Sequence, residues 1–153
     1  MRYKIIKYKY LALFCTMFII SCNNDEVEPI DCVVTITDNN ITYVDGNKFN
    51  GQCYIYASDG VIVRLRSYKR GQLNGIQKAW YYPDRELAYI GYRKNGEIHG
   101  KYTGYHRNGS IQAEGNMRRG YYSGKWKYYD ESGKLIMEKS FYKGEAVDSI
   151  LIN

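Results

Sequence analysis

The sequence is poor in the residues from which most metal and catalytic centres are built. It has only two histidines, His99 and His106, and neither stands at ligand spacing from the other or from the cysteines. No stretch repeats its apolar residues every 3.6 positions, and glycine recurs too often for helices. We therefore expect an all-β chain that holds no metal and no cofactor.

Long apolar runs are also missing, apart from one at the N-terminus. Residues 1–10 carry four basic side chains, and Leu11–Ile20 form a ten-residue apolar run. Ten residues span about 15 Å as a helix, which is half the hydrocarbon thickness of a bilayer. A basic start followed by a short apolar run predicts a secretory signal peptide over residues 1–21, removed from the mature protein.

The residues around the predicted cleavage point resemble a signal for lipid attachment. Ile19-Ile20-Ser21-Cys22 is similar to a bacterial lipobox, which implies that Cys22 is acylated and anchors the protein in the outer membrane, at the cell surface or on the periplasmic face. Residues 22–31 are polar and acidic and predict a flexible tether. Their acidity resembles the surface-export signal of lipoproteins from Bacteroidetes-type bacteria, although an ordinary secretion signal and a plain spacer remain alternatives.

Excess positive charge is missing from the mature chain. The whole sequence has 22 basic and 16 acidic residues, but the leader holds four of the basic residues and none of the acidic ones. The mature part therefore has 18 against 16, a net charge of +2. Such a balance gives no electrostatic reason to expect nucleic-acid binding.

The dominant feature of residues 32–153 is a repeat with a period of about 24 residues. Glycines, aromatic residues, turn residues and aliphatic residues recur in register through four units. A fixed period of this size predicts a repeat array in which each unit packs only on its neighbours. The columns are Gly51, Gly75, Gly100, Gly124; Tyr56, Tyr81, Tyr105, Tyr129; Gly60, Arg85, Gly109, Gly133; Ile62, Leu87, Ile111, Leu135; and Gly71, Gly96, Gly120, Gly144.

The turn residues between these columns predict β-hairpins. Asp-Gly, Asn-Gly and Ser-Gly pairs flanked by aromatic and β-branched residues favour tight turns with positive φ. We expect ten to twelve antiparallel strands in one twisted single-layer meander. A degenerate hairpin at 32–44 would cap one end, and a last strand at 148–152 the other. The second unit has one extra residue, so Trp80 and Tyr81 both remain candidates for its tyrosine position.

These motifs resemble a known repeat family. The pattern Gly-x-Trp-x-x-Tyr…Gly-x-Leu, with Asn95-Gly-Glu-Ile-His-Gly100 between units, is similar to the MORN repeat, in the variant found in YwqK-type antitoxins of bacteria. The likeness covers residues 45–141 and implies a β-hairpin binding or scaffold module. Cys53 and Gln77 depart from it at aromatic positions, and Arg85 departs at the turn glycine.

No set of residues in the sequence predicts catalysis. No serine lies in a nucleophile-elbow context. His99 falls in a corner position and His106 in a position next to the tyrosine column, both of which other residue types occupy in other units. Carboxylates such as Glu97, Glu114 and Glu138 recur through the repeats, so we interpret them as cross-strand ion-pair partners and not as an acid/base pair. The protein is predicted not to be an enzyme.

Two cysteines remain once the leader and the lipid have accounted for Cys15 and Cys22. Cys32 and Cys53 would close a loop of about 20 residues, and an oxidising envelope compartment favours a disulfide between them. Two buried free thiols in a capping unit are the alternative. Cys53 occupies the column of Tyr102 and Trp126, so we expect it on the same side of the sheet.

Fifteen tyrosines in the mature chain are the remaining candidates for function. We interpret those in columns as structural, because a single-layer sheet has no second sheet to cover it. The predicted binding face is Trp80, Tyr82, Arg118, Arg119, Tyr121, Tyr122 and Trp126. Arginine beside tyrosine favours a protein partner. The resemblance to YwqK-type antitoxins implies an immunity or antitoxin-like role for that binding. A glycan-binding accessory lipoprotein of an outer-membrane uptake system and an envelope scaffold stay open.

Overall fold

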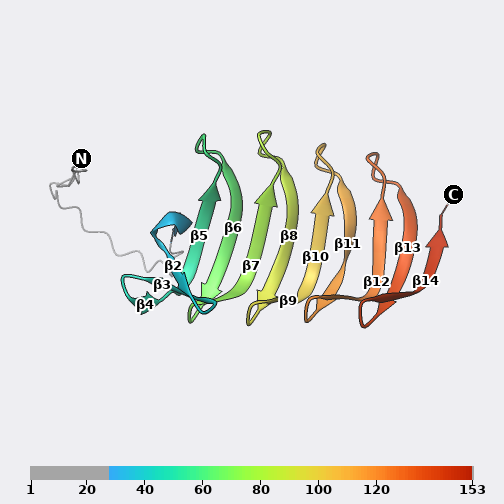
Figure 1. Cartoon of the computed structure of the whole chain (residues 1–153). Helices are drawn as coiled ribbons and strands as arrows, with labels where there is room; N and C mark the ends of the chain where they lie inside the picture. The colour runs from blue at the N-terminus through green and yellow to red at the C-terminus, as the bar shows by residue number, and fades with distance from the viewer. Residues whose placement is uncertain (1–27, 153) are drawn as a thin grey trace, which may run out of the picture.

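The computed structural model describes residues 28–152, which form one long sheet with a small cap at its N-terminal end (Figure 1). The long sheet has eleven strands in the order β1-β5-β6-β7-β8-β10-β11-β12-β13-β14, with β9 paired to β8, and the cap is a second sheet of order β2-β3-β4. The predicted all-β array of antiparallel hairpins is confirmed. The elements are β1 (Ile30–Asp31), the 3-10 helix η1 (Cys32–Val34), β2 (Ile36–Asp38), β3 (Ile41–Val44), β4 (Asn47–Lys48), β5 (Gly51–Tyr56), β6 (Ile62–Lys69), β7 (Gln72–Trp80), β8 (Leu87–Lys94), β9 (Glu97–Ile98), β10 (Gly100–Tyr105), β11 (Ile111–Arg118), β12 (Tyr121–Tyr129), β13 (Leu135–Tyr142) and β14 (Glu145–Leu151).

One edge of the sheet, here called the corner edge, is made of two-residue turns between consecutive strands. Both central residues of each turn have positive φ, as in type I′ hairpins. The second of the two is glycine in all four corner turns. Each corner also bonds to the preceding one: Gly96 N–H donates to Leu73 O at 2.8 Å, and Gly120 N–H donates to Ile98 O at 2.9 Å. The corner turns are Arg70–Gly71, Asn95–Gly96, Arg119–Gly120 and Lys143–Gly144.

The opposite edge, here called the turn edge, carries longer loops. The strand pairing at this edge shows where the extra residue of the second unit lies. Trp80 pairs with Leu87 in the same way as Tyr105 pairs with Ile111. Trp80 therefore holds the tyrosine position of the second unit. Tyr81 begins the turn instead, and its N–H donates to Glu86 O.

The core is a row of residues that crosses the sheet on one face. Tyr102 lies over Gly91 and Trp126 over Gly115, positions where an added Cβ would meet the neighbouring ring. Trp126 is only 2% exposed, and the Tyr102 ring lies 5.7 Å from it. Cross-strand pairing continues this row to Cys53 through Gln77, as the column alignment predicts. A single-layer sheet thus buries its aromatic rings against its own glycines.

The other face bears two cross-strand ion pairs. Lys101 lies 3.9 Å from Glu114 and Lys127 lies 4.0 Å from Glu138, each on a neighbouring strand. The Tyr129 hydroxyl also donates to Glu114 at 2.8 Å. These contacts confirm the interpretation of Glu114 and Glu138 as cross-strand partners.

The N-terminal end differs from the hairpin predicted for residues 32–44. Residues 32–34 form η1 rather than a strand, and β2 and β3 pair in the separate cap sheet. Asp31 explains the helix, because its side chain accepts a hydrogen bond from Val33 N–H and caps the turn. Ile30–Asp31, assigned to the tether from sequence, instead pair in parallel with β5.

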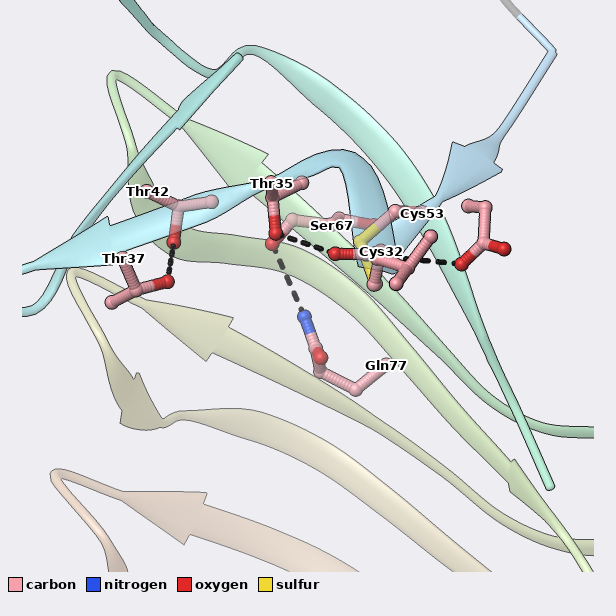
Figure 2. Close-up of a disulfide and its surroundings, with 9 residues drawn as sticks. Cys32, Thr35, Thr37, Thr42, Cys53, Ser67 and Gln77 are labelled. Carbon is pink, nitrogen blue, oxygen red and sulfur yellow. Dashed lines mark hydrogen bonds between the residues drawn. A yellow bond between two sulfur atoms is a disulfide. The ribbon is translucent and has the colours of Figure 1, made fainter. Parts of the chain in front are cut away.

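Cys32 and Cys53 form a disulfide that fastens η1 to β5 (Figure 2). The Cys53 side chain, which forms one half of this bridge, is completely buried. Beside it Gln77, 6% exposed, donates to Ser67 O at 3.3 Å, so a polar network fills the row where the later units have rings. The cap sheet is attached at the first corner, where Thr42 N–H donates to Gly71 O at 2.8 Å.

Candidate functional site

A hollow of about 590 Å³ opens on the corner edge near the C-terminal end of the sheet. We call it the corner hollow. It brings together four residues of the predicted binding face from the end of β11, its turn and the start of β12. Two residues of the next corner complete it. The hollow is lined by Arg118, Arg119, Tyr121, Tyr122, Ser123, Tyr142 and Lys143.

The aromatic rings of the corner hollow combine exposure with rigid support. Tyr121 is 61% exposed, Tyr122 43% and Tyr142 65%. Tyr122 packs against the core, with its ring 4.5 Å from Trp126 and 5.0 Å from Phe141. Tyr121 lies over Gly144, where an added Cβ would come within 2.8 Å of the ring. The core therefore supports Tyr122 and the corner turn at Gly144 supports Tyr121, while a side of each ring stays open to solvent.

The cations of the corner hollow carry uncompensated charge. Within residues 28–152, none of Arg118, Arg119 and Lys143 forms an ion pair. The Lys143 ammonium lies 5.3 Å from the centre of the Tyr142 ring. The hollow therefore joins three positive charges to three exposed phenol rings.

Three of these lining residues were missed by sequence reasoning, namely Ser123, Tyr142 and Lys143. Tyr142 and Lys143 follow Arg118 and Arg119 by 24 residues, so they occupy the same two positions in the next unit. The repeat period therefore contained the signal. The pattern did not show that consecutive corners lie close enough to form one hollow.

The predicted residues Trp80 and Tyr82 lie elsewhere, on the turn edge near the N-terminal end. A second hollow of about 360 Å³, the turn hollow, is lined by Tyr54, Tyr56, Gly60, Ile62, Trp80 and Arg85. Tyr82 stands outside this lining and donates its hydroxyl to Asp59 at 3.0 Å. The predicted binding residues thus divide between two sites.

Trp126 belongs to neither site, which corrects its assignment to an exposed face. With 2% of its surface exposed, it lies in the core, and its indole N–H donates to Asn116 O at 3.0 Å. The sequence placed it in an aromatic column but could not show that neighbouring rings cover it.

Hydrogen bonds at the turn edge set the ionisation of Asp59 and Tyr82. The Val61 N–H and then the Tyr82 hydroxyl stabilise the Asp59 carboxylate and lower its pKa. The same bond raises the pKa of Tyr82, because the phenol must give up its hydrogen bond to ionise beside a carboxylate. Asp59 is therefore an anion at neutral pH.

His106 links two adjacent turns. Its Nε2 lies 2.9 Å from Tyr129 O, in a hydrogen bond between the third and fourth units. Tyr81 does the same one unit earlier, where its hydroxyl donates to Tyr105 O at 2.8 Å. His106 is therefore equivalent to Tyr81, not to Tyr82 as the sequence alignment had it.

Two further properties concern the described part of the chain. Residues 28–152 contain no cluster of three histidine, cysteine or acidic side chains that could hold a metal ion. No helix in this part is long and apolar enough to cross a membrane.

Comparison with known families gives two matches, which overlap at residues 98–105. Residues 98–118 and 122–143 match the MORN repeat variant, while residues 43–105 match the N-terminal region of the histone H3 K4-specific methyltransferase SET7. No curated protein matches the chain significantly. The MORN matches cover β10, β11, β13 and nearly all of β12, while residues 119–121 of the corner turn fall between them. Two C-terminal units of this chain are therefore similar to the MORN repeat variant, as the sequence pattern predicts.

Proposed function

We propose that this protein is a non-catalytic envelope lipoprotein that binds an acidic surface of a partner protein in the corner hollow. The observation that carries the proposal is the presence of three cations that form no ion pair within residues 28–152 among three exposed tyrosines. Tyrosine and arginine are enriched in the centres of protein interfaces.

The rigidity of the rings supports a binding role. A side chain that is already fixed loses little conformational entropy when a partner covers it. Tyr122 is fixed by Trp126 and Phe141, and Tyr121 by Gly144. The guanidinium groups of Arg118 and Arg119 can pair bidentately with carboxylates, so the partner is expected to present aspartate or glutamate.

The proposed anchor lies at the other end of the molecule. Acylation of Cys22, which falls outside the described residues, would tie the chain to the membrane just before β1. The strand order places β1 at one end of the sheet and β12–β14 at the other. The corner hollow would therefore face away from the membrane, where a soluble or neighbouring protein can reach it.

An immunity-type role is the specific form of this proposal. Binding and neutralising an incoming protein requires a rigid surface with complementary charge and no catalytic group. The likeness of the repeats to YwqK-type antitoxins favours this form.

The test asks whether capture of a partner protein depends on the arginines of the corner hollow. The mature chain, residues 22–153, is used as bait against envelope and secreted fractions, and captured polypeptides are compared with those of an Arg118→Glu/Arg119→Glu variant. Lys94→Glu is the matched control, since Lys94 ends β8 one unit earlier, as Arg118 ends β11. We expect one polypeptide that the double variant loses and the control retains. A polypeptide captured equally by all three proteins would refute the proposed site.

Lipid attachment has a separate test. Mass spectrometry of the protein from its native membrane should show an acylated Cys22 at the mature N-terminus, and Cys22→Ala should release the protein into the soluble fraction. An unmodified Cys22 in the membrane-bound protein would contradict the anchor while leaving the binding site untouched.

A further inference from the structure

The turn hollow exists because the repeat is broken at one position. Between the second and third units the Tyr81 side chain bonds to the next turn, and between the third and fourth His106 does so. The equivalent first residue of the first turn is Ala57, whose N–H makes the same turn bond to Val61 O. Alanine has no polar group with which to reach the second unit, and the turn hollow lies at this junction.

The walls of the turn hollow are aromatic. Tyr54 and Tyr56 lie edge to face, with ring centroids 6.3 Å apart, and Tyr56 is 40% exposed. Trp80 comes from the neighbouring hairpin and is partly exposed. A volume of about 360 Å³ lies in the range of small-molecule sites, which starts near 300 Å³. The hollow can therefore take a flat ring between side chains of two units.

Arg85 supplies a cation at a position where the other turns have glycine. The equivalent residues are glycines, and Gly109 and Gly133 have φ of +83° and +86°. Arg85 adopts φ of +62°, a conformation that glycine accepts at less cost than arginine. Its guanidinium takes part in no hydrogen bond or ion pair within residues 28–152, whereas Arg107 nearby pairs with Asp84 and lies over the Tyr81 ring.

Asp59 precedes Gly60 of the lining and adds hydrogen-bond acceptors beside the hollow. Its two oxygens accept bonds from Val61 N–H at 3.2 Å and from the Tyr82 hydroxyl at 3.0 Å. A carboxylate has further lone pairs that can accept from a ligand hydroxyl. The hollow therefore offers ring faces, a cation and hydroxyl acceptors together, and a sugar that bears a carboxylate has groups to match all three.

We propose that the turn hollow binds a carboxylate-bearing sugar residue of an acidic glycan. The apolar face of the sugar ring stacks on Trp80 and Tyr56, its carboxylate pairs with the guanidinium of Arg85, and its hydroxyls donate to Asp59. This site is distinct from the corner hollow, and the protein would hold both ligands at once because the two hollows lie on opposite edges of the sheet.

The experiment uses the mature chain on an array of glycans that includes uronic- and sialic-acid oligosaccharides beside their neutral counterparts. We expect retention of carboxylated glycans, with affinity about tenfold weaker for Arg85→Gly and Trp80→Ala. Arg85→Gly restores the residue of the other turns, so its thermal midpoint should not fall. Arg64→Gln, which removes an exposed arginine from β6, is the matched control and should bind as wild type does.

Tryptophan fluorescence gives an independent readout with the glycans that the array retains. The chain has two tryptophans, and because Trp126 is buried, a ligand in the turn hollow should change the emission of Trp80. Retention of no glycan, retention of neutral glycans alone, or equal binding by wild type and Arg85→Gly would each overturn the proposal. An Arg118→Glu/Arg119→Glu variant should bind these glycans normally, so failure of one site is distinguishable from failure of the other.

Discussion

The two halves of this array fill the same row of the sheet by different means. In the C-terminal half Tyr102 and Trp126 lie over glycines of the neighbouring strand, and stacked rings form the core. In the N-terminal half the row holds Gln77 and Cys53, and the cover comes from η1, a disulfide and the cap sheet (Figure 2). The match to the MORN repeat variant begins at residue 98 and so lies in the half with the stacked rings.

This difference shows how the first unit of a single-layer sheet can be covered. A stacked ring needs a glycine under it and another ring beside it, and the first unit of an array has no earlier unit to supply these. A covalent bridge and a short helix close that end without a further ring. The cost is a polar row, in which Gln77 must find its hydrogen bond to Ser67 O because it is buried.

The largest effect should come from the centre of the aromatic half. Trp126→Ala removes a ring that is 2% exposed and should lower the free energy of unfolding by about 3–5 kcal/mol. Because repeats contact only their neighbours, hydrogen exchange should increase in β11–β13 and change little in β5 and β6. Trp80→Ala is the control at a partly exposed tryptophan. Equal loss of protection along the whole sheet would refute the division into two halves.

The next largest loss of stability should come from removing the Cys32–Cys53 disulfide at the N-terminal end of the sheet. The sequence separation of 21 between Cys32 and Cys53 corresponds to about 3 kcal/mol in the chain-entropy description. Cys32→Ala/Cys53→Ala should therefore lower the thermal midpoint and expose amides of β1, β2 and β5. Amides of β12 and β13 should keep their protection. Reductant should destabilise the wild type and leave the double variant unchanged, and a reductant effect of equal size on both proteins would contradict this assignment.

The sequence contained most of the fold because its period is set by local chemistry. A positive-φ glycine at the end of each corner turn fixes where strands reverse, and the alternation between corners fixes the strands themselves. The extra residue of the second unit could be located only to a segment, since Trp80 and Tyr81 are both aromatic. Pairing of Trp80 with Leu87 decides the position.

The site was less predictable, because burial and proximity depend on contacts between units. Trp126 and Tyr122 were both predicted to lie on the binding face. In the structure Trp126 is buried in the core, and the exposed Tyr122 ring packs against it. The turn hollow depends on Ala57, a residue without functional groups, and no motif draws attention to a missing side chain. The cap could not be derived either, since η1 depends on the Asp31 side chain and on a disulfide that the sequence left open.

A smaller effect should come from the glycines under the rings. An added Cβ at Gly115 would overlap the Trp126 ring, whereas one at Gly91 would lie 3.3 Å from Tyr102. Gly115→Ala should therefore cost about 1–3 kcal/mol and Gly91→Ala clearly less, as measured by denaturant titration. Neither glycine has a positive φ that would confuse the comparison. Equal costs at both positions would show that ring-on-glycine packing does not set the stability of this half.

The smallest predicted effect concerns pH and again distinguishes the aromatic half. Burial, with the neighbouring Tyr89 as a second cause, raises the pKa of Tyr102, and burial likewise raises that of Tyr128. In the unfolded chain a tyrosine titrates near pH 10, so between that pH and the folded pKa the native state holds a proton that the unfolded state has lost. The stability from these neutral phenols is therefore complete below about pH 10 and is lost as the pH rises through the folded pKa.

Tyr102→Phe keeps the ring without the ionisable group, so its thermal midpoint should fall less above about pH 10 than that of wild type. The difference should correspond to less than about 1 kcal/mol, because the Tyr102 side chain is only half-buried. Tyr142→Phe, at an exposed tyrosine, should follow the wild-type curve. Parallel alkaline curves for wild type and Tyr102→Phe would mean that the buried phenol does not govern this response, and the stacked row would then owe its stability to packing alone.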